Sequence, residues 1–231
     1  MTTTPARPRR SSSCRRSALS TVTSARACAS EAPLGNALGM RIVGGTLSGR
    51  RFSGPPGKST RPTSERVREG IASALISRGW IDGAQVLDLY AGTGALAFEM
   101  LSRGAEAAVL IEKSRPVAKA IARSAQELGL GSRALVVQAD LERAATSWLS
   151  RIPRPADLVL LDPPYADIAH AQSVLSSLAE HGKLADGAAV VVEFRKRCPP
   201  VLPLGFDEVS SYRYGDTAVL LATFTRDEAQ P

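Results

Sequence analysis

The chain has 231 residues, 44% of them hydrophobic, and a formal net charge of +7, which suits one α/β domain with appendages and a sizeable core. No stretch approaches the roughly 18 consecutive apolar residues that span a bilayer, which argues against a membrane protein. The three cysteines (Cys14, Cys28 and Cys198) are far apart and lack partnering histidines, so they indicate neither a disulfide framework nor a zinc site. We expect a soluble, cytoplasmic protein without a metal.

Most of the positive charge lies in residues 1–39, which hold six arginines and one glutamate and thus contribute +5, leaving +2 for residues 40–231. This segment is rich in Ser, Thr, Ala and Arg without apolar periodicity, so we interpret it as a disordered extension. The same composition is typical of an organelle transit peptide. We favour the alternative in which the segment is dispensable, or in which translation begins at Met40. The positive net charge of the whole chain is therefore weak evidence for a nucleic-acid partner.

Residues 40–80 are predicted to form an arginine-rich extension. Segments 41–45 and 47–52 are predicted to pair as a short β-hairpin. Thr63 is the expected N-cap of a helix that Gly79 ends, with an apolar face made of Val67, Ile71, Ala74 and Leu75. Basic side chains of this extension are candidate contacts for RNA phosphates: Arg41, Arg50, Arg51 and Lys58. The run Arg195-Lys196-Arg197 is a second candidate, with an ordinary solvated face as the alternative.

Residues 81–226 are predicted to form one doubly wound domain. Apolar strands are predicted at 85–90, 107–112, 133–138, 156–161 and 188–194, with helices between them at 95–103, 115–128, 140–149 and 168–181. Strands that are apolar throughout are typical of a parallel sheet buried on both faces. Segments 208–213 and 217–224 are predicted to form an antiparallel hairpin. This order favours a methyltransferase over a dehydrogenase, and predicts a Rossmann-like, mostly parallel seven-stranded sheet.

A glycine-rich loop follows the first of these strands. Residues 92–97 fit the G-x-G-x-x-G/A pattern, and Glu112 lies 20 residues after Gly92. This geometry suits a dinucleotide as well as S-adenosylmethionine, because both need close backbone approach and a carboxylate for the ribose hydroxyls. Asp88 favours S-adenosylmethionine, because a carboxylate repels a pyrophosphate but attracts an ammonium or sulfonium group. Capping of the loop is the alternative role of Asp88.

Two further carboxylates each follow or end a predicted strand. For Glu112 we expect ribose binding, with a surface ion pair to Lys113 as the alternative. Asp140 either caps the following helix or accepts a proton from the adenine amino group.

The segment Asp162-Pro163-Pro164-Tyr165 closes the fourth predicted strand. Two prolines cannot continue a ladder, so the backbone turns and presents Asp162 and the Pro163 carbonyl to a pocket. Two acceptors can bind both N–H protons of an aryl amine and turn its lone pair toward a methyl group. The Tyr165 ring offers a face for stacking an extruded base. An ordinary strand-ending turn is the alternative. Together the two loops predict methyl transfer to an amino group.

Four segments of the chain resemble the RsmD-type methyltransferases of bacteria: 40–45, 61–69, 87–96 and 162–165. The resemblance covers residues 40 to about 224, and its most family-specific part is Arg-Pro-Thr…Arg-Val-Arg-Glu at 61–69. It implies a class I S-adenosylmethionine-dependent methyltransferase acting on the N2 amino group of one guanine in 16S rRNA, within a partly assembled small subunit. We expect a monomer. The chain departs from the family pattern at Gly70-Ile71-Ala72-Ser73, where a bulkier Leu-Phe-Asn-like run is usual.

The resemblance also implies residue roles. The methyl donor would lie against Asp88, Tyr90, Ala91, Gly92, Thr93, Gly94, Glu112, Lys113, Asp140 and Leu141. The guanine would lie against the catalytic residues Asp162, Pro163, Pro164 and Tyr165, with Arg61, Thr63 and Arg66 closing the site. The alternatives are N6-adenine or protein-glutamine methylation by the same tetrapeptide, an NAD-dependent oxidoreductase, and an RNA-binding module without catalysis.

Overall fold

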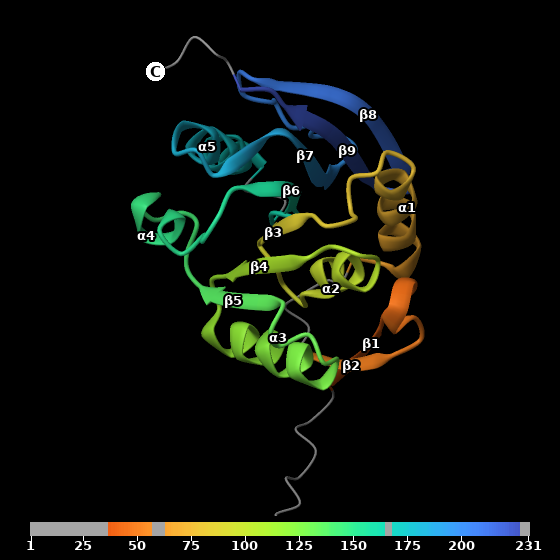
Figure 1. Cartoon of the computed structure of the whole chain (residues 1–231). Coiled ribbons are helices and arrows are strands. Elements are labelled where there is room, and N and C mark those ends of the chain that lie inside the picture. The colour runs from red at the N-terminus through yellow and green to blue at the C-terminus, as the bar shows by residue number, and fades with distance from the viewer. Residues whose placement is uncertain (1–36, 57–62, 165–167, 227–231) are drawn as a thin grey trace, which may run out of the picture. The chain divides into compact units, whose positions relative to one another are not determined.

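The central sheet has seven strands in the order β5-β4-β3-β6-β7-β9-β8 (Figure 1). The computed structural model describes residues 37–56, 63–164 and 168–226. Five strands are parallel: β3 (Gln85–Leu89), β4 (Ala107–Glu112), β5 (Ala134–Gln138), β6 (Ala156–Leu161) and β7 (Leu184–Arg195). β9 (Thr217–Phe224) pairs antiparallel with β7, and β8 (Phe206–Tyr214) pairs antiparallel with β9 at the edge. The predicted Rossmann-like fold, a mostly parallel sheet that ends in an antiparallel hairpin, is confirmed.

The strand order reverses at β3. From β3 the chain moves outward through β4 to β5, and it then crosses back so that β6 pairs with the other side of β3. In an open α/β sheet, ligands bind at such a switch point, outside the carboxyl ends of the strands. Leu89, the last residue of β3, lies opposite Leu161, the last residue of β6. The glycine-rich loop and the Asp-Pro-Pro segment therefore leave the sheet side by side.

Two apolar cores cover the two faces of the sheet. Alternate residues of a strand point to opposite faces, so Val86 and Leu110 belong to one core, while Leu87 and Val109 belong to the other. The first core includes α1 (Glu65–Ile76), α2 (Ala95–Ser102) and α3 (Arg115–Glu127). The second includes α4 (Thr146–Leu149) and α5 (Ile168–Glu180). None of the helices in the described ranges is long and apolar enough to cross a membrane.

A two-stranded hairpin precedes α1 and packs against α2 and α3. β1 (Ala37–Arg41) pairs with β2 (Arg51–Pro56), and the 3-10 turn η1 (Gly45–Leu47) lies between them. Glu99 of α2, which has no solvent exposure, accepts hydrogen bonds from the amides of Val43 (2.9 Å) and Gly44 (2.7 Å). Ser124 of α3 donates to the carbonyl of Ser53 over 2.6 Å. These bonds fix the hairpin on the helices that border the first core.

The two strands of the hairpin lie further from the connecting turn, along the sequence, than the pattern predicts. β1 begins at Ala37, three residues before the expected boundary at Met40, because Ala37 pairs with Pro56. The expected strand segments 41–45 and 47–52 instead hold most of the connection. Gly45 and Gly49 have φ values of 78° and 80°, in the left-handed region that strands do not use. Two glycines therefore turn the chain where the pattern predicts extended backbone.

Two predicted helix features are wrong. Ser64, not Thr63, is the N-cap of α1, because its hydroxyl accepts a hydrogen bond from the Val67 amide over 3.3 Å. The helix predicted at 140–149 is reduced to α4. There Asp140 Oδ1 accepts from the Glu142 amide over 3.1 Å, and the Asp140 carbonyl accepts from the Arg143 amide over 3.2 Å. These bonds close a local turn in place of the first helical turns.

Candidate active site

A cavity of about 760 Å³ lies at the carboxyl ends of the parallel strands, where the loops after β3 and β6 meet. Its described lining contains five carboxylates and one lysine: Glu112, Asp140, Glu142, Asp162, Glu193 and Lys113. The cavity wall is therefore acidic, although the chain as a whole carries a net charge of +7. Such a wall attracts cations and hydrogen-bond donors and repels phosphate groups.

The glycine-rich loop reaches the cavity through residues in left-handed backbone conformations. Tyr90, Gly92 and Gly94 have φ values of 63°, 54° and 73°. Tyr90 and Gly92 line the cavity. Gly94 is the N-cap of α2, where a Cβ would lie 3.0 Å from Ile121 and 3.1 Å from Phe98. The predicted cofactor residues Ala91, Thr93 and Gly94 thus shape the loop, but they are not part of the cavity lining.

The Glu112 carboxylate links the glycine-rich loop to the start of α3 by two hydrogen bonds. Its Oε2 accepts from the Gly92 amide over 3.0 Å, and its Oε1 accepts from the Ser114 amide over 2.7 Å. The alternative of an ion pair between Glu112 and Lys113 is wrong. Lys113 instead pairs with Asp140 at 3.3 Å and with Glu142 at 2.7 Å. Because β4 and β5 are parallel neighbours, these acidic residues border the same side of the cavity, together with Leu141.

Asp88 lies next to the cavity but does not line it. Its side chain is 4% exposed, and Oδ2 has no hydrogen-bond partner in the described part of the chain. Burial, with the negative charge of Asp162 as the second cause, raises the pKa of Asp88 to about 8, although a hydrogen bond from the Ala97 amide lowers it. Ala97 belongs to the first turn of α2, whose amides lack helical acceptors. Asp88 therefore interacts with the helix N-terminus, in line with its capping alternative.

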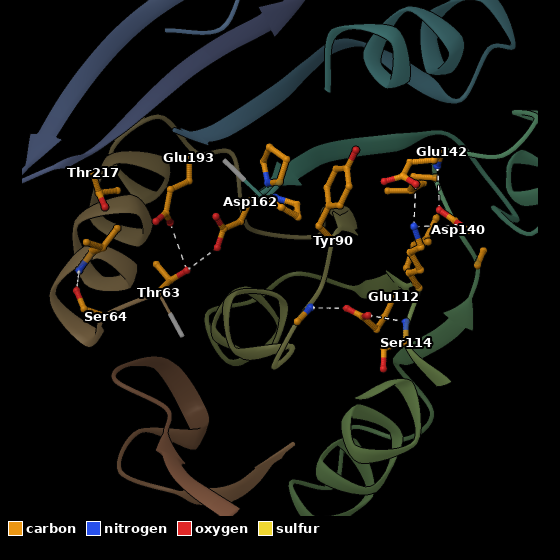
Figure 2. Close-up of a pocket in the computed structure, with 18 of the residues that line it drawn as sticks. Thr63, Ser64, Tyr90, Glu112, Ser114, Asp140, Glu142, Asp162, Glu193 and Thr217 are labelled. Atoms are coloured by element: carbon orange, nitrogen blue, oxygen red, sulfur yellow. Dashed lines mark hydrogen bonds and ion pairs between the residues drawn. The ribbon is translucent and has the colours of Figure 1, made fainter. Parts of the chain in front are cut away.

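The other side of the cavity carries the Asp-Pro-Pro segment. Asp162, Pro163 and Pro164 all line it, whereas Tyr165 lies outside the described residues. Thr63 Oγ1 lies 3.1 Å from Asp162 Oδ2 and 3.3 Å from Glu193 Oε2, so one hydroxyl connects two carboxylates. In the view of Figure 2, Tyr90 stands between this cluster and the group formed by Glu112, Asp140 and Glu142. The two predicted half-sites thus belong to one cavity.

Nine lining residues are not among the predicted site residues: Ser64, Val67, Ile111, Ser114, Ala139, Glu142, Glu193, Tyr214 and Thr217. Glu193 carried a usable signal, because it is an acid near the end of the apolar run 188–194, as Glu112 is at the end of β4. Tyr214 gave no local signal. It reaches the cavity beside Gly70 of α1, where a Cβ would lie 2.1 Å from the Tyr214 hydroxyl. Gly70, the first position that departs from the family pattern, thus leaves room for an aromatic ring.

Two of the candidate RNA contacts, Arg41 and Arg50, have partners within the protein. Arg41 forms an exposed ion pair with Glu65 at 2.6 Å. Arg50 donates to the carbonyls of Glu127 (2.8 Å) and Leu128 (3.1 Å) at the C-terminus of α3. Arg51 and Arg66 are exposed, as are Arg195, Lys196 and Arg197 at and just beyond the carboxyl end of β7. Lys58 and Arg61 lie outside the described residues.

A buried arginine connects the hairpin to the cavity. Arg68 of α1 is 1% exposed, and its guanidinium donates to the carbonyls of Thr63 and Arg41, both over 2.8 Å. Burial lowers its pKa below the usual value. Arg68 thus links Arg41, the last residue of β1, to Thr63. Thr63 in turn contacts Asp162 and Glu193 in the cavity.

Residues 40–223 match the family model described as Conserved hypothetical protein 95. The chain belongs to this family. It is the family of the RsmD-type enzymes, so the resemblance in the sequence is confirmed and the chain is an S-adenosylmethionine-dependent methyltransferase.

Individual proteins agree with the family assignment. The ribosomal RNA small subunit methyltransferase D of Escherichia coli K12 is 37% identical over 154 residues, which cover 67% of this chain and 74% of that protein. A hypothetical protein of Thermus thermophilus superposes with a TM-score of 0.64 at 29% identity, covering 79% of this chain and 98% of that one. An RNA methyltransferase of Salinibacter ruber, solved with S-adenosyl-L-homocysteine, shares the fold with a TM-score of 0.54 at 20% identity, covering 74% and 98% of the two chains.

Proposed function

We propose that this RsmD-family protein transfers a methyl group from S-adenosylmethionine to the exocyclic N2 amino group of one guanine in 16S rRNA. The observation that carries the proposal is the shared cavity: Gly92 and Glu112 line one side, and Asp162 and Pro163 line the other. A donor and an acceptor bound to these two sides would meet inside a single enclosed volume, which is the arrangement that direct transfer requires.

The donor side suits a cationic nucleoside better than a dinucleotide. The five carboxylates of the whole lining, three of which (Glu112, Asp140 and Glu142) lie on this side, favour the ammonium and sulfonium groups of S-adenosylmethionine and oppose a pyrophosphate, which argues against the NAD-dependent alternative. Asp88 Oδ2, which has no hydrogen-bond partner among the described residues, lies next to this side of the cavity, and a cationic donor would favour its charged form. Glu112 and Asp140 line this side, and in the proposal Glu112 binds the ribose hydroxyls and Asp140 accepts from the adenine amino group. The bound donor supplies an electrophilic methyl group on a sulfonium.

The acceptor side suits an aryl amine. Such an amine is a poor nucleophile, because its lone pair is delocalised into the ring. The Asp162 carboxylate and the Pro163 carbonyl would accept its two N–H protons, and would thereby turn the lone pair toward the methyl group. Neither group needs to act as a strong base, since orientation and electrostatic stabilisation in an enclosed site favour the reaction. Stacking of the base on Tyr165 stays a prediction.

The choice of 16S rRNA rests on the family and on surface charge. The Escherichia coli relative is named a ribosomal RNA small subunit methyltransferase, which supports small-subunit rRNA as the substrate. That this rRNA is methylated within a partly assembled small subunit stays a prediction. The exposed run Arg195-Lys196-Arg197 lies at the end of β7, close in sequence to the cavity residue Glu193. Positive charge at the rim would bind phosphates while the acidic interior receives the base.

The test is transfer of a radiolabelled methyl group from the donor to 16S rRNA, both naked and in small-subunit particles, followed by nucleoside analysis. We expect the label in N2-methylguanosine at one position. Label in N6-methyladenosine, or in protein glutamine, would establish one of the alternative acceptors. Calorimetry with NAD and with S-adenosylmethionine separates the oxidoreductase alternative, because binding of NAD alone would overturn the proposal.

A further inference from the structure

Tyr214 lies at the rim of the cavity, where β7 and β8 end and β9 begins. In the pairing of these strands, Arg195 lies opposite Thr217, and Thr217 lies opposite Tyr214. Residues opposite each other in a sheet point to the same face, and Tyr214 packs against the first core, on the face that carries α1. Tyr214 and Thr217 both line the cavity, on the side of Ser64 (Figure 2). Tyr214 is only partly buried, so it borders both the cavity and the solvent.

The backbone on both sides of the Tyr214 ring fixes its position. The turn Gly215-Asp216 connects β8 to β9, and the Asp216 carbonyl accepts from the Lys196 amide over 3.1 Å, which holds the turn against the end of β7. On the other side, a Cβ at Gly70 of α1 would lie 2.1 Å from the Tyr214 hydroxyl. The ring is therefore seated between the turn and the helix. A ring that is already held in place offers a binding surface at a small cost in entropy.

A cationic side chain accompanies this ring. Arg66 precedes Gly70 by four residues, so the two positions share one face of α1. Burial and the neighbouring Tyr212 raise the pKa of Tyr214, whereas the positive charge of Arg66 lowers it. The Arg66 guanidinium is thus within electrostatic reach of the Tyr214 hydroxyl. Arg66 is also exposed, so a ligand at the rim can reach its charge.

An aromatic face beside a cation suits a nucleotide of single-stranded RNA, because the base stacks on the ring and the phosphate binds the cation. A base extruded into the cavity also leaves its neighbours in the RNA without a stacking partner. We propose that Tyr214 and Arg66 form a subsite at the rim for the nucleotide next to the target, with its base stacked on the Tyr214 ring and its phosphate bound by Arg66. The inference rests on the proposed RNA substrate and adds a contact outside the reacting base.

The test separates a stacking ring from one that only packs β8 against α1. The methylated nucleotide is first mapped, and the active form of the rRNA substrate is then assembled by ligation with an abasic residue immediately before or immediately after it. Tyr214→Leu keeps an apolar side chain against α1 and removes the aromatic face, whereas Tyr214→Phe keeps that face. The readout is kcat/KM for methyl transfer by each enzyme on each RNA.

On intact RNA we expect Tyr214→Leu to lose about 5- to 100-fold in kcat/KM, the range that loss of one base–aromatic stack produces, and Tyr214→Phe to match wild type. On one of the two abasic RNAs, wild type should lose as much, and Tyr214→Leu should lose nothing further. A loss in Tyr214→Leu that is equally large on intact RNA and on both abasic RNAs would overturn the subsite. Full activity of this variant on intact RNA would overturn it as well.

Tyr212→Leu is the matched control for the ring. Tyr212 lies two residues earlier on β8, packs against the same core and is not among the residues that line the cavity. It should match wild type on every RNA, and calorimetric donor binding checks that all variants are folded.

The cation is tested by RNA binding at several salt concentrations. Arg66→Gln should reduce the slope of log affinity against log salt by roughly 0.7–0.9. Arg151→Gln, in the exposed segment before β6, should keep the wild-type slope. An unchanged slope in Arg66→Gln would exclude Arg66 from the subsite.

Failure of the subsite differs from failure of the proposed function. Label in a base other than guanine would overturn the proposed function alone, because the abasic RNAs are built around whichever nucleotide is mapped. Transfer to protein glutamine instead of RNA would overturn both.

Discussion

Thr63 and Asp162 lie 99 positions apart in the chain, and the Thr63 hydroxyl lies 3.1 Å from Asp162 Oδ2. Thr63 and Ser64, the two residues directly before α1, are thus part of the cavity wall. The N-terminal extension therefore contributes to the proposed reaction site as well as to any RNA-binding surface. Variants in this extension are expected to alter turnover and not only substrate affinity.

Replacement of the Asp162 carboxylate should separate catalysis from donor binding. In Asp162→Ala we expect methyl transfer to fall by at least about 100-fold, because an acceptor that orients the amine is lost. Donor affinity should change little, because Gly92, Glu112 and Asp140 remain. Single-turnover transfer and calorimetry measure the two quantities. Asp207→Ala, on the exposed face of β8, is the control. Retained activity in Asp162→Ala would remove its central role.

Asp88 should make stability depend on pH. Its folded pKa of about 8 lies above its ordinary value of 3.8, so the folded protein binds more protons between these values and its stability decreases as pH rises through this window. Asp88→Asn, which stays neutral, should remove this decrease. We expect the variant to gain roughly 2–5 kcal/mol over wild type near pH 9 and little near pH 5. Urea unfolding at both pH values measures the gain. If the free energies of unfolding of wild type and Asp88→Asn change equally with pH, the pH dependence does not come from Asp88.

The guanidinium of Arg68 should be difficult to replace. In Arg68→Lys, one ammonium group cannot span the Thr63 and Arg41 carbonyls, so buried acceptors lose a partner. We expect a loss of about 2–4 kcal/mol in the free energy of unfolding. Methyl transfer should also fall, because Thr63 loses its anchor, while donor affinity is kept. Arg123→Lys, exposed on α3, should match wild type in urea unfolding. If Arg68→Lys has the same free energy of unfolding as this control, the two hydrogen bonds of Arg68 do not contribute to stability.

RNA binding should be strongly salt-dependent. Lys196→Ala and Arg197→Ala each remove one side chain that can bind a phosphate, and each should reduce the slope of log affinity against log salt by roughly 0.7–0.9. Filter binding of 16S rRNA at several salt concentrations measures this slope. Arg151→Ala is the control. Arg151 is exposed and precedes β6, so it lies toward the amino ends of the parallel strands, away from the cavity at their carboxyl ends. A flat salt response in wild type would exclude a phosphate-binding rim.

Much of the fold was readable from the sequence because buried parallel strands are apolar without interruption. The predicted strands 107–112 and 156–161 match β4 and β6 in full. The two site loops were also readable, because glycine and proline at strand ends restrict the backbone in known ways. Asp162 and Gly92 indeed line one cavity.

The features that the sequence did not reveal depend on distant neighbours. Thr63 and Ser64 are equally good capping residues by type, and only the position of Asp162 explains why Ser64 caps α1 while Thr63 faces the cavity. Helix-forming residues at 140–149 predicted a longer helix, but the Asp140 side chain competes for the Glu142 amide. Glu193 is an acid near the end of an apolar strand, but only the pairing of β7 with β6 brings it next to Asp162.

The absence of a side chain at Gly70 has an evolutionary consequence. The space that a larger residue would fill on α1 is used here by the ring of Tyr214 from the edge strand β8. A homologue with a bulkier residue at position 70 needs a smaller side chain at position 214, or one that points elsewhere, because the two side chains would otherwise overlap. The two positions should therefore co-vary, and the mouth of the cavity should differ in shape between lineages that share the same catalytic loops.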